Sequence, residues 1–455
     1  MSHRLRSFDI TMLVISLVIG IGIFRTPQIV AQQAGTLPLF ALAWVLGAFC
    51  SMCGALTFAR IGTMHPVAGG FYSIFSTSYH PGLAFAMNWS LVVTNAASMA
   101  GVALIGAEYL APVIVQGPVR DIHLHAIVCT IVLTLYMFNV RGLRWGAGTQ
   151  NALSLLKIVM ILGLSSLMFF VMGNVSGPQP IHESLQQSAG GASLHDQATW
   201  YSALGAALIS VFFTYGGYQS TINIGSDIDT PQRTFPRGII SAMIIVLLLY
   251  GFVNLAYVYV LGFEAVKTSP LVAAQLASAV FGENGMRVTG IVIVVSVLGF
   301  LNSGLMCLPQ TMTAMAEDGM LPSYFARSKH GEAVNARTLT VFTVLMLVLY
   351  FGLGTFQRLM NYVMFTDSMA LALGAGCVYV LSAKSKSNDN IPIPSLLSWI
   401  SHFMVPAVFI VIMLIVTLNV TISEPGNAIA GTMVFMLGAL VFILRRRVLV
   451  KGKKV

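Results

Sequence analysis

The chain has 455 residues, of which 56% are hydrophobic and only 9% are charged, and its mean hydropathy is +0.83. These values exclude a water-soluble globular protein and indicate a polytopic membrane protein. The formal net charge of +9 therefore reflects membrane topology and contact with anionic lipid headgroups, not nucleic-acid binding.

Apolar runs of about 20 residues, the length that crosses a bilayer as a helix, mark about twelve candidate spans. They cover residues 10–30, 39–59, 82–107, 122–140, 146–172 and 200–224, then 238–261, 288–316, 339–353, 360–382, 400–420 and 429–444. The sequence therefore predicts an all-α polytopic membrane protein. The first apolar run is too long for a cleaved signal peptide and lacks a small-residue cleavage site.

The first span contains an interruption near the middle of the membrane. Residues 18–27 read VIGIGIFRTP, with two glycines, an arginine and a proline inside the apolar run. Backbone that leaves helical geometry in a membrane must find partners in protein, ligand or water, because lipid offers none. The N–H groups and positive dipole end of the second half-helix suit a carboxylate. Close helix packing is the alternative interpretation of these glycines.

Two ionisable residues follow in later spans. Glu108 lies near the outer end of the third span, and Lys157 lies about two turns into the fifth. An ammonium group at that depth costs several kcal/mol unless it snorkels to the headgroups or finds partners inside the bundle. The sequence leaves both possibilities open. If Lys157 finds partners inside the bundle, it forms a buried cation site that can also exchange a proton.

A second glycine pair interrupts the sixth span, where residues 211–220 read VFFTYGGYQS. The two interrupted spans lie five apart, which is the pattern expected of transporters built from two inverted repeats. The predicted organisation is a first repeat at residues 1–173, an extracellular loop at 174–197, a second repeat at 198–382, and two further spans with a basic tail at 383–455. Asp367 places a carboxylate inside the tenth span, the repeat partner of the fifth.

The distribution of basic residues predicts the orientation. With an even number of spans both termini lie on one side, and 18 of the 24 lysines and arginines fall on that side against four on the other. The positive-inside rule then predicts cytoplasmic termini. All five cysteines lie within apolar spans, so we expect no disulfide-linked accessory subunit. The nine histidines form no ligand cluster, so we expect no haem, catalytic metal or other cofactor.

Five segments stand in order between about residue 8 and residue 325. They read GIGIF at 20–24, GTMHPVAGGFY at 62–72, QNA at 150–152 with Lys157, FTYGGYQ at 213–219 through PQRTFP at 231–236, and MAEDGMLP at 315–322. Together they resemble the amino acid–polyamine–organocation (APC) permease family, nearest its L-type amino-acid transporter branch, whereas the last two spans carry little identity. The resemblance implies the LeuT-type fold, with two inverted five-helix repeats and two extra helices.

The resemblance also implies a substrate site at the two breaks. The implied substrate-binding residues are Val18, Ile21, Gly22, Ile23, Phe213, Thr214, Gly216 and Asp367. The first break would bind the α-carboxylate. The α-amino group would be bound by carbonyls near Val18 and at the second break. Phe213 would close over the site as an aromatic gate. Lys157 matches the lysine that occupies the sodium position in sodium-independent members. Asn302 and Ser303 would border that position.

Three positions depart from the family pattern. Ile21 stands where members commonly carry a serine or alanine, which removes a possible hydroxyl contact and narrows the pocket. Arg60 replaces the usual glutamate and Glu317 replaces the usual arginine, both at cytoplasmic helix ends. We predict a swapped Arg60–Glu317 ion pair at the inner gate. Independent solvation of the two side chains is the alternative.

These features predict a secondary-active amino-acid permease that works by alternating access without sodium, by exchange or by proton symport. A neutral substrate is favoured because Phe213 and Tyr218 offer apolar walls, whereas Asp367 keeps a cationic amino acid or a polyamine as the alternative. A non-transporting sensor on the same fold is a further alternative. A membrane-embedded enzyme is disfavoured because no cluster of His, Asp or Glu occurs at one membrane depth.

Overall fold

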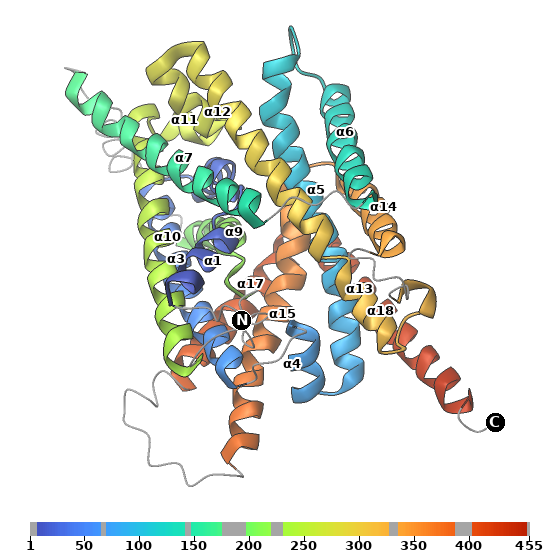
Figure 1. Cartoon of the computed structure of the whole chain (residues 1–455). Coiled ribbons are helices and arrows are strands. Elements are labelled where there is room, and N and C mark those ends of the chain that lie inside the picture. Colours follow the sequence, from blue (N-terminus) through green and yellow to red (C-terminus); the bar gives the residue numbers. More distant parts are fainter. Residues whose placement is uncertain are drawn as a thin grey trace.

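The computed structural model describes residues 7–64, 70–141, 147–174, 197–219, 231–326, 335–386 and 403–452. Its regular elements within these ranges are helices (Figure 1). Ten of the described helices are long and apolar enough to cross a membrane, and two shorter apolar helices belong to the first and sixth predicted spans. The predicted all-α polytopic fold with about twelve spans is therefore confirmed.

The first five spans alternate with short connections. Their elements are α1 (Ser7–Val18), η1 (Gly22–Phe24), α2 (Thr26–Ala34), α3 (Leu37–Met64), α4 (Gly70–Ser78), α5 (Pro81–Ile114), α6 (Asp121–Val140) and α7 (Ala147–Asn174). The predicted outer loop at 174–197 falls almost entirely outside the described residues.

The next five spans begin with a second interrupted helix. Their elements are α9 (Gln197–Tyr215), α10 (Pro231–Leu261), α11 (Phe263–Thr268), α12 (Val272–Cys307), α13 (Gln310–Glu317), η4 (Ser323–Phe325), α14 (Ala336–Leu353) and α15 (Phe356–Lys386). Two further spans, α17 (Val405–Ser423) and α18 (Pro425–Gly452), complete the chain. Interrupted helices thus open both groups of five, as the LeuT-type fold requires. The residue boundaries of the two repeats stay a prediction.

Local sequence explains how several of these helices begin and end. The His80 ring accepts a hydrogen bond from Gly82 N–H, and Pro81 starts α5 with the backbone angle that a first helical turn needs. Asn335 caps α14, which ends at Gly354 with a φ of +73°. Gly282, with a φ of +63°, bends α12 so that residues 272–281 lead away from the rest of the span.

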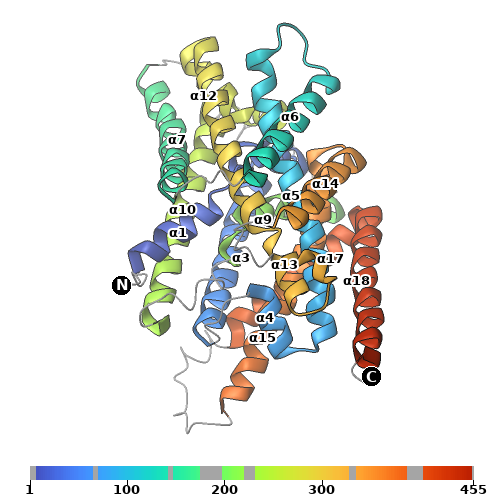
Figure 2. The same cartoon turned by 45° about the vertical axis from the view of Figure 1, so that its right-hand side comes forward.

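The interrupted helices lie in the middle of the bundle. α2 packs along α9, α3 packs against both of them, and α10 packs against α1 and α3. Of the apolar stretch in each span, 78% is buried in α5 but only 28% in α17 and α18, so α5 is a central pillar and the last two spans are peripheral. The first turns of α12 lie at one end of the bundle and α4 at the other (Figures 1 and 2). The interrupted helices therefore lie between the end of the bundle formed by the first turns of α12 and the end formed by α4.

Candidate functional site

The first span is interrupted where the sequence predicts. α1 ends at Val18, and regular structure resumes only with the 3₁₀ turn at Gly22. The Val18 carbonyl accepts a hydrogen bond of 3.1 Å from the Tyr250 hydroxyl of α10, and the Ile19 carbonyl accepts one of 3.0 Å from Lys157 Nζ of α7. The Gly20 N–H also donates to the Val18 carbonyl, so side chains and a local backbone turn together satisfy the carbonyls at the end of α1, as an apolar surrounding demands.

The second interruption follows Tyr215, the last residue of α9. Gly216 and Gly217 form a turn, and Gly217 has a φ of +118°, which favours glycine. A Cβ atom at residue 217 would lie 2.3 Å from the Leu17 carbonyl oxygen, so only glycine lets the two breaks pack backbone against backbone. Residues 220–224, the remainder of the predicted sixth span, lie outside the described residues.

A pair of threonines joins the two breaks. Thr26 Oγ1 lies 2.6 Å from Thr214 Oγ1, and it also donates to the Gly22 carbonyl at 2.9 Å. The Tyr250 hydroxyl lies 3.4 Å from the Thr214 carbonyl. The structure therefore brings together Gly22 and Thr214, two of the implied site residues. The sequence could have indicated Thr26 as a site residue, because it lies one helical turn after Gly22. No pattern in the sequence marks Tyr250.

The hydroxyl of Tyr250 should be needed for tight substrate binding. The Tyr250→Phe substitution removes the hydroxyl that donates to the Val18 carbonyl and lies 3.4 Å from the Thr214 carbonyl, and the Val18 carbonyl then keeps, among the described residues, only the Gly20 N–H as a donor. Each hydrogen bond lost in this way costs about 0.5–1.5 kcal/mol. We expect the substrate Kd to rise about tenfold, measured by isothermal titration on the purified protein. Tyr257→Phe is the matched control, since Tyr257 lies on the same helix, is fully buried, and its hydroxyl is without a partner among the described residues. An equal loss in both variants would contradict a specific role.

Lys157 points into the bundle. Its side chain is 2% exposed, its ammonium group donates to the Ile19 carbonyl, and the ring of Phe300 on α12 lies 5.8 Å away. This geometry favours the bundle-facing position over snorkelling to the headgroups. It also ties α7 directly to the first break.

Asn302 and Ser303, also on α12, make other contacts. Asn302 Oδ1 accepts a hydrogen bond of 2.8 Å from Asn139 of α6, and Ser303 donates to the Gly299 carbonyl of its own helix. Asn139 is a polar partner that the sequence analysis missed, because a single asparagine in an apolar span gives no sign of which helix it faces.

The apolar members of the implied site lie around the breaks. Ile21 and Ile23 are buried, and the half-buried ring of Phe213 packs edge-on against Phe356 of α15, with 5.8 Å between ring centroids. Asp367, further along α15, interacts electrostatically with Tyr218, the residue that follows the second break. The implied aromatic gate and the partly buried Asp367 carboxylate thus come from two helices, α9 and α15.

The predicted inner-gate residues lie at the end of the bundle that carries α4. Arg60 donates from Nη2 to the Ser382 hydroxyl at 3.2 Å, and Glu317 is exposed at the last residue of α13. Their ion pair stays a prediction. Nearby, burial and the Asp318 carboxylate raise the pKa of Tyr72 to about 12, so the hydroxyl stays protonated and donates to Asp318. α4 is thereby linked to the end of α13.

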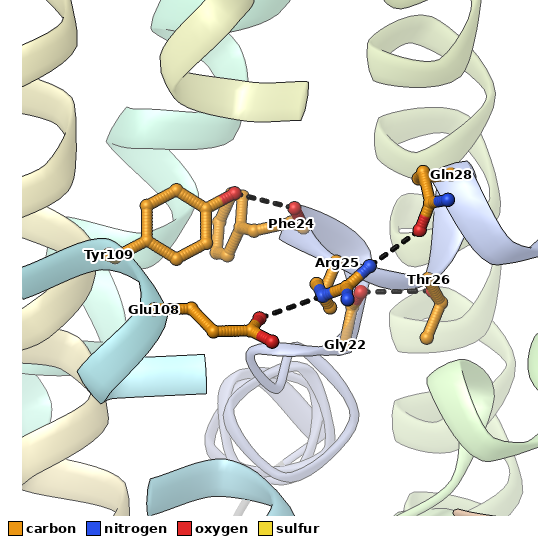
Figure 3. Close-up of polar contacts among 7 residues, drawn as sticks. All are labelled: Gly22, Phe24, Arg25, Thr26, Gln28, Glu108 and Tyr109. Atoms are coloured by element: carbon orange, nitrogen blue, oxygen red, sulfur yellow. Dashed lines mark hydrogen bonds and ion pairs between the residues drawn. The ribbon is translucent and has the colours of Figure 1, made fainter. Parts of the chain in front are cut away.

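A further cluster of polar side chains lies where the first break leads into α2. Figure 3 shows Arg25 between Glu108 of α5 and Gln28 of α2. Arg25 Nε donates to Glu108 Oε2 at 2.8 Å, and the Tyr109 hydroxyl donates to the Phe24 carbonyl at 2.7 Å. The sequence shows two opposite charges inside apolar spans, and only the fold shows that they pair.

Comparisons with known proteins point to a single family. The family model described as "Amino acid permease" matches residues 5–444. The chain is 27% identical to the serine/threonine exchanger SteT of Bacillus subtilis (strain 168) over 312 residues, which cover 68% of this chain and 67% of the exchanger. It is 24% identical to the b(0,+)-type amino acid transporter 1 of Mus musculus over 441 residues, covering 94% and 85%. It is 25% identical to the large neutral amino acids transporter small subunit 2 of Homo sapiens over 402 residues, covering 85% and 72%.

Proposed function

Because the chain belongs to the amino acid permease family, we propose that it is a secondary-active carrier that moves L-amino acids by alternating access, without sodium and with neutral amino acids favoured. The resemblance to the APC permeases is confirmed, with relatives of the L-type branch and the serine/threonine exchanger among those found. The protein is a multi-pass membrane transporter and not an enzyme.

The observation that carries this proposal is the meeting of two interrupted helices inside the bundle. η1 begins at Gly22, and the first N–H groups of a helix have no partner within it, so they suit an α-carboxylate. The carbonyls at the end of α9, around Phe213 and Thr214, face the same region and suit an α-ammonium group. A zwitterion therefore has a partner for each of its charges.

Lys157 supports the proposal of sodium independence. Its ammonium group donates to a carbonyl of the first break, so it places a positive charge where a bound cation would otherwise satisfy that oxygen. A lysine that keeps its proton favours exchange or facilitated diffusion, and one that cycles its proton favours symport. The name of the Bacillus relative, an exchanger, adds weight to exchange.

A second substrate class is supported by Asp367. A partly buried carboxylate beside the second break would pair with the extra positive charge of a cationic amino acid or a polyamine. A sensor that binds amino acids without moving them is the remaining alternative. We also propose that the protein lies in the cell (inner) membrane with both termini cytoplasmic, which the distribution of basic residues supports. We expect no disulfide-linked accessory subunit, because the cysteines lie within apolar spans.

Counterflow in proteoliposomes tests the proposal directly. Vesicles preloaded with unlabelled leucine, alanine, arginine or putrescine should accumulate labelled leucine, with the neutral amino acids driving the most accumulation and sodium having no effect. Arginine or putrescine as the strongest driver would favour the second substrate class. Binding without accumulation would indicate a sensor, and a response to an imposed proton gradient would select symport.

A further inference from the structure

The Arg25–Glu108 ion pair joins two different spans. Arg25 directly follows the 3₁₀ turn of the first break, whereas Glu108 lies in α5, the central pillar. Their side chains are 13% and 19% exposed, so water reaches both only slightly. The ion pairs Lys267–Glu264 and Arg287–Glu283 are more exposed, and each lies within one helix. An ion pair inside one helix cannot hold two spans together.

Arg25 is also connected to the implied aromatic gate, Phe213, through the ring of Phe356. Its guanidinium carbon is 5.9 Å from the ring centre of Phe356, and that ring packs edge-on against Phe213. Cation–π and edge-to-face contacts of this kind are favourable where water is excluded. The ion pair, Phe356 and Phe213 therefore form one continuous stack that runs from α5 across to α9.

The segment around Arg25 is held on its other sides as well. Gln28 Nε2 donates to the Lys267 carbonyl of α11 at 2.9 Å, and the Tyr109 hydroxyl donates to the Phe24 carbonyl (Figure 3). The segment from η1 to the first turn of α2 is thus hydrogen-bonded both to α5 and to α11. In the proposed orientation the end of the bundle that carries α11 faces the outside.

We propose that Arg25 and Glu108 form a latch that closes the outer path to the substrate site, and that this ion pair must separate before an amino acid enters. The latch rests on the proposed function, since it takes the two breaks as the substrate site and the α11 end as the outer one. Separating two nearly buried charges is unfavourable unless water reaches both, so the latch should open only together with a wetted vestibule. Removing one charge should leave the outer path open more of the time.

Solvent access to Thr26 provides the test. Thr26 is fully buried, follows Arg25 in the chain, and contacts Thr214 across the two breaks. The Thr26→Cys variant is treated in intact cells with a membrane-impermeant maleimide, and labelling of the five native cysteines is measured on the parent chain and subtracted. We expect slow labelling with the latch intact and labelling about tenfold faster when Glu108→Gln is added, since each tenfold change in the open fraction is about 1.4 kcal/mol.

Three further variants sharpen the result. Glu264→Gln is the matched control, because it removes an outer carboxylate from an ion pair that joins no two spans, and it should leave the labelling rate unchanged. The double exchange Arg25→Glu with Glu108→Arg restores an opposite-charge pair and should slow labelling again. Arg25→Lys keeps the charge but loses the Nε contact, so it should give an intermediate rate even if the Glu108 variant fails to fold.

The outcomes separate the latch from the proposed function. Unchanged labelling in a correctly folded Glu108→Gln protein, or an equal increase with Glu264→Gln, would overturn the latch. A cysteine at Gln116, which is exposed in the loop before α6, reports the orientation. If it is labelled only in inverted vesicles, the α11 end faces the cytoplasm, and both the proposed topology and the outer latch are overturned. Faster labelling of Thr26→Cys when Glu108→Gln is added, in a protein that shows no counterflow, would support the latch but contradict the proposed carrier function.

Discussion

Replacing Lys157 with alanine should lower counterflow of labelled amino acid about tenfold or more while the protein still inserts and purifies as a folded membrane protein. The ammonium group is 2% exposed and donates to the Ile19 carbonyl at 3.0 Å. Without it, a carbonyl in a non-helical stretch inside the membrane has lost its charged donor, at a cost of roughly 1–3 kcal/mol. Because this carbonyl belongs to the first break, its loss of a donor should displace the substrate site and so lower counterflow.

The comparison with other lysine variants decides what Lys157 does. Lys157→Arg keeps a fixed positive charge, so it should retain exchange if the charge alone matters and lose any response to a proton gradient. Lys267→Ala is the control, since Lys267 lies on short α11 and pairs with Glu264 at the protein surface. Unchanged counterflow and unchanged pH dependence in Lys157→Ala would remove lysine from the mechanism, and sodium independence would lose its main support.

The interruptions were predictable because they violate the rules for a membrane helix in a visible way. Glycine pairs, with an arginine and a proline nearby, weaken a helix wherever it lies, and a lysine in an apolar run must have partners. These signals depend on residue type and on position within a span. They located both breaks within a few residues, and they singled out Lys157 before any contact was known.

The partners of these residues were not predictable, because they depend on how each helix is rotated about its axis. Spans of this chain are apolar all round, so their sequences carry little sign of which side faces a neighbour. Tyr250 satisfies two carbonyls at the breaks, and Asn139 binds Asn302, yet neither stands out in the sequence. Arg25 and Glu108 were each unusual, but 83 residues separate them and only the packing of α5 against the first break joins them.

Gly217 should be among the least replaceable residues of the protein. An alanine there would need a φ of +118°, which costs about 1–3 kcal/mol for a residue with a Cβ atom. Its Cβ would also lie 2.3 Å from the Leu17 carbonyl oxygen, which is backbone and cannot rotate away as a side chain would. We therefore expect Gly217→Ala to lower counterflow at least about tenfold and to lower Tm, because the two breaks can no longer pack against each other.

Gly251→Ala provides the matched control for this effect. Gly251 lies in α10, which packs against α1, but a Cβ atom there would meet no atom within 4 Å among the described residues. Alanine is the better helix former by about 1 kcal/mol, so Gly251→Ala should keep full counterflow and a Tm equal to or above that of the parent. If Gly217→Ala transports like the parent, the two breaks do not need backbone contact. The zwitterion site would then have to lie elsewhere in the bundle, since the close approach of α1 and α9 would no longer define it.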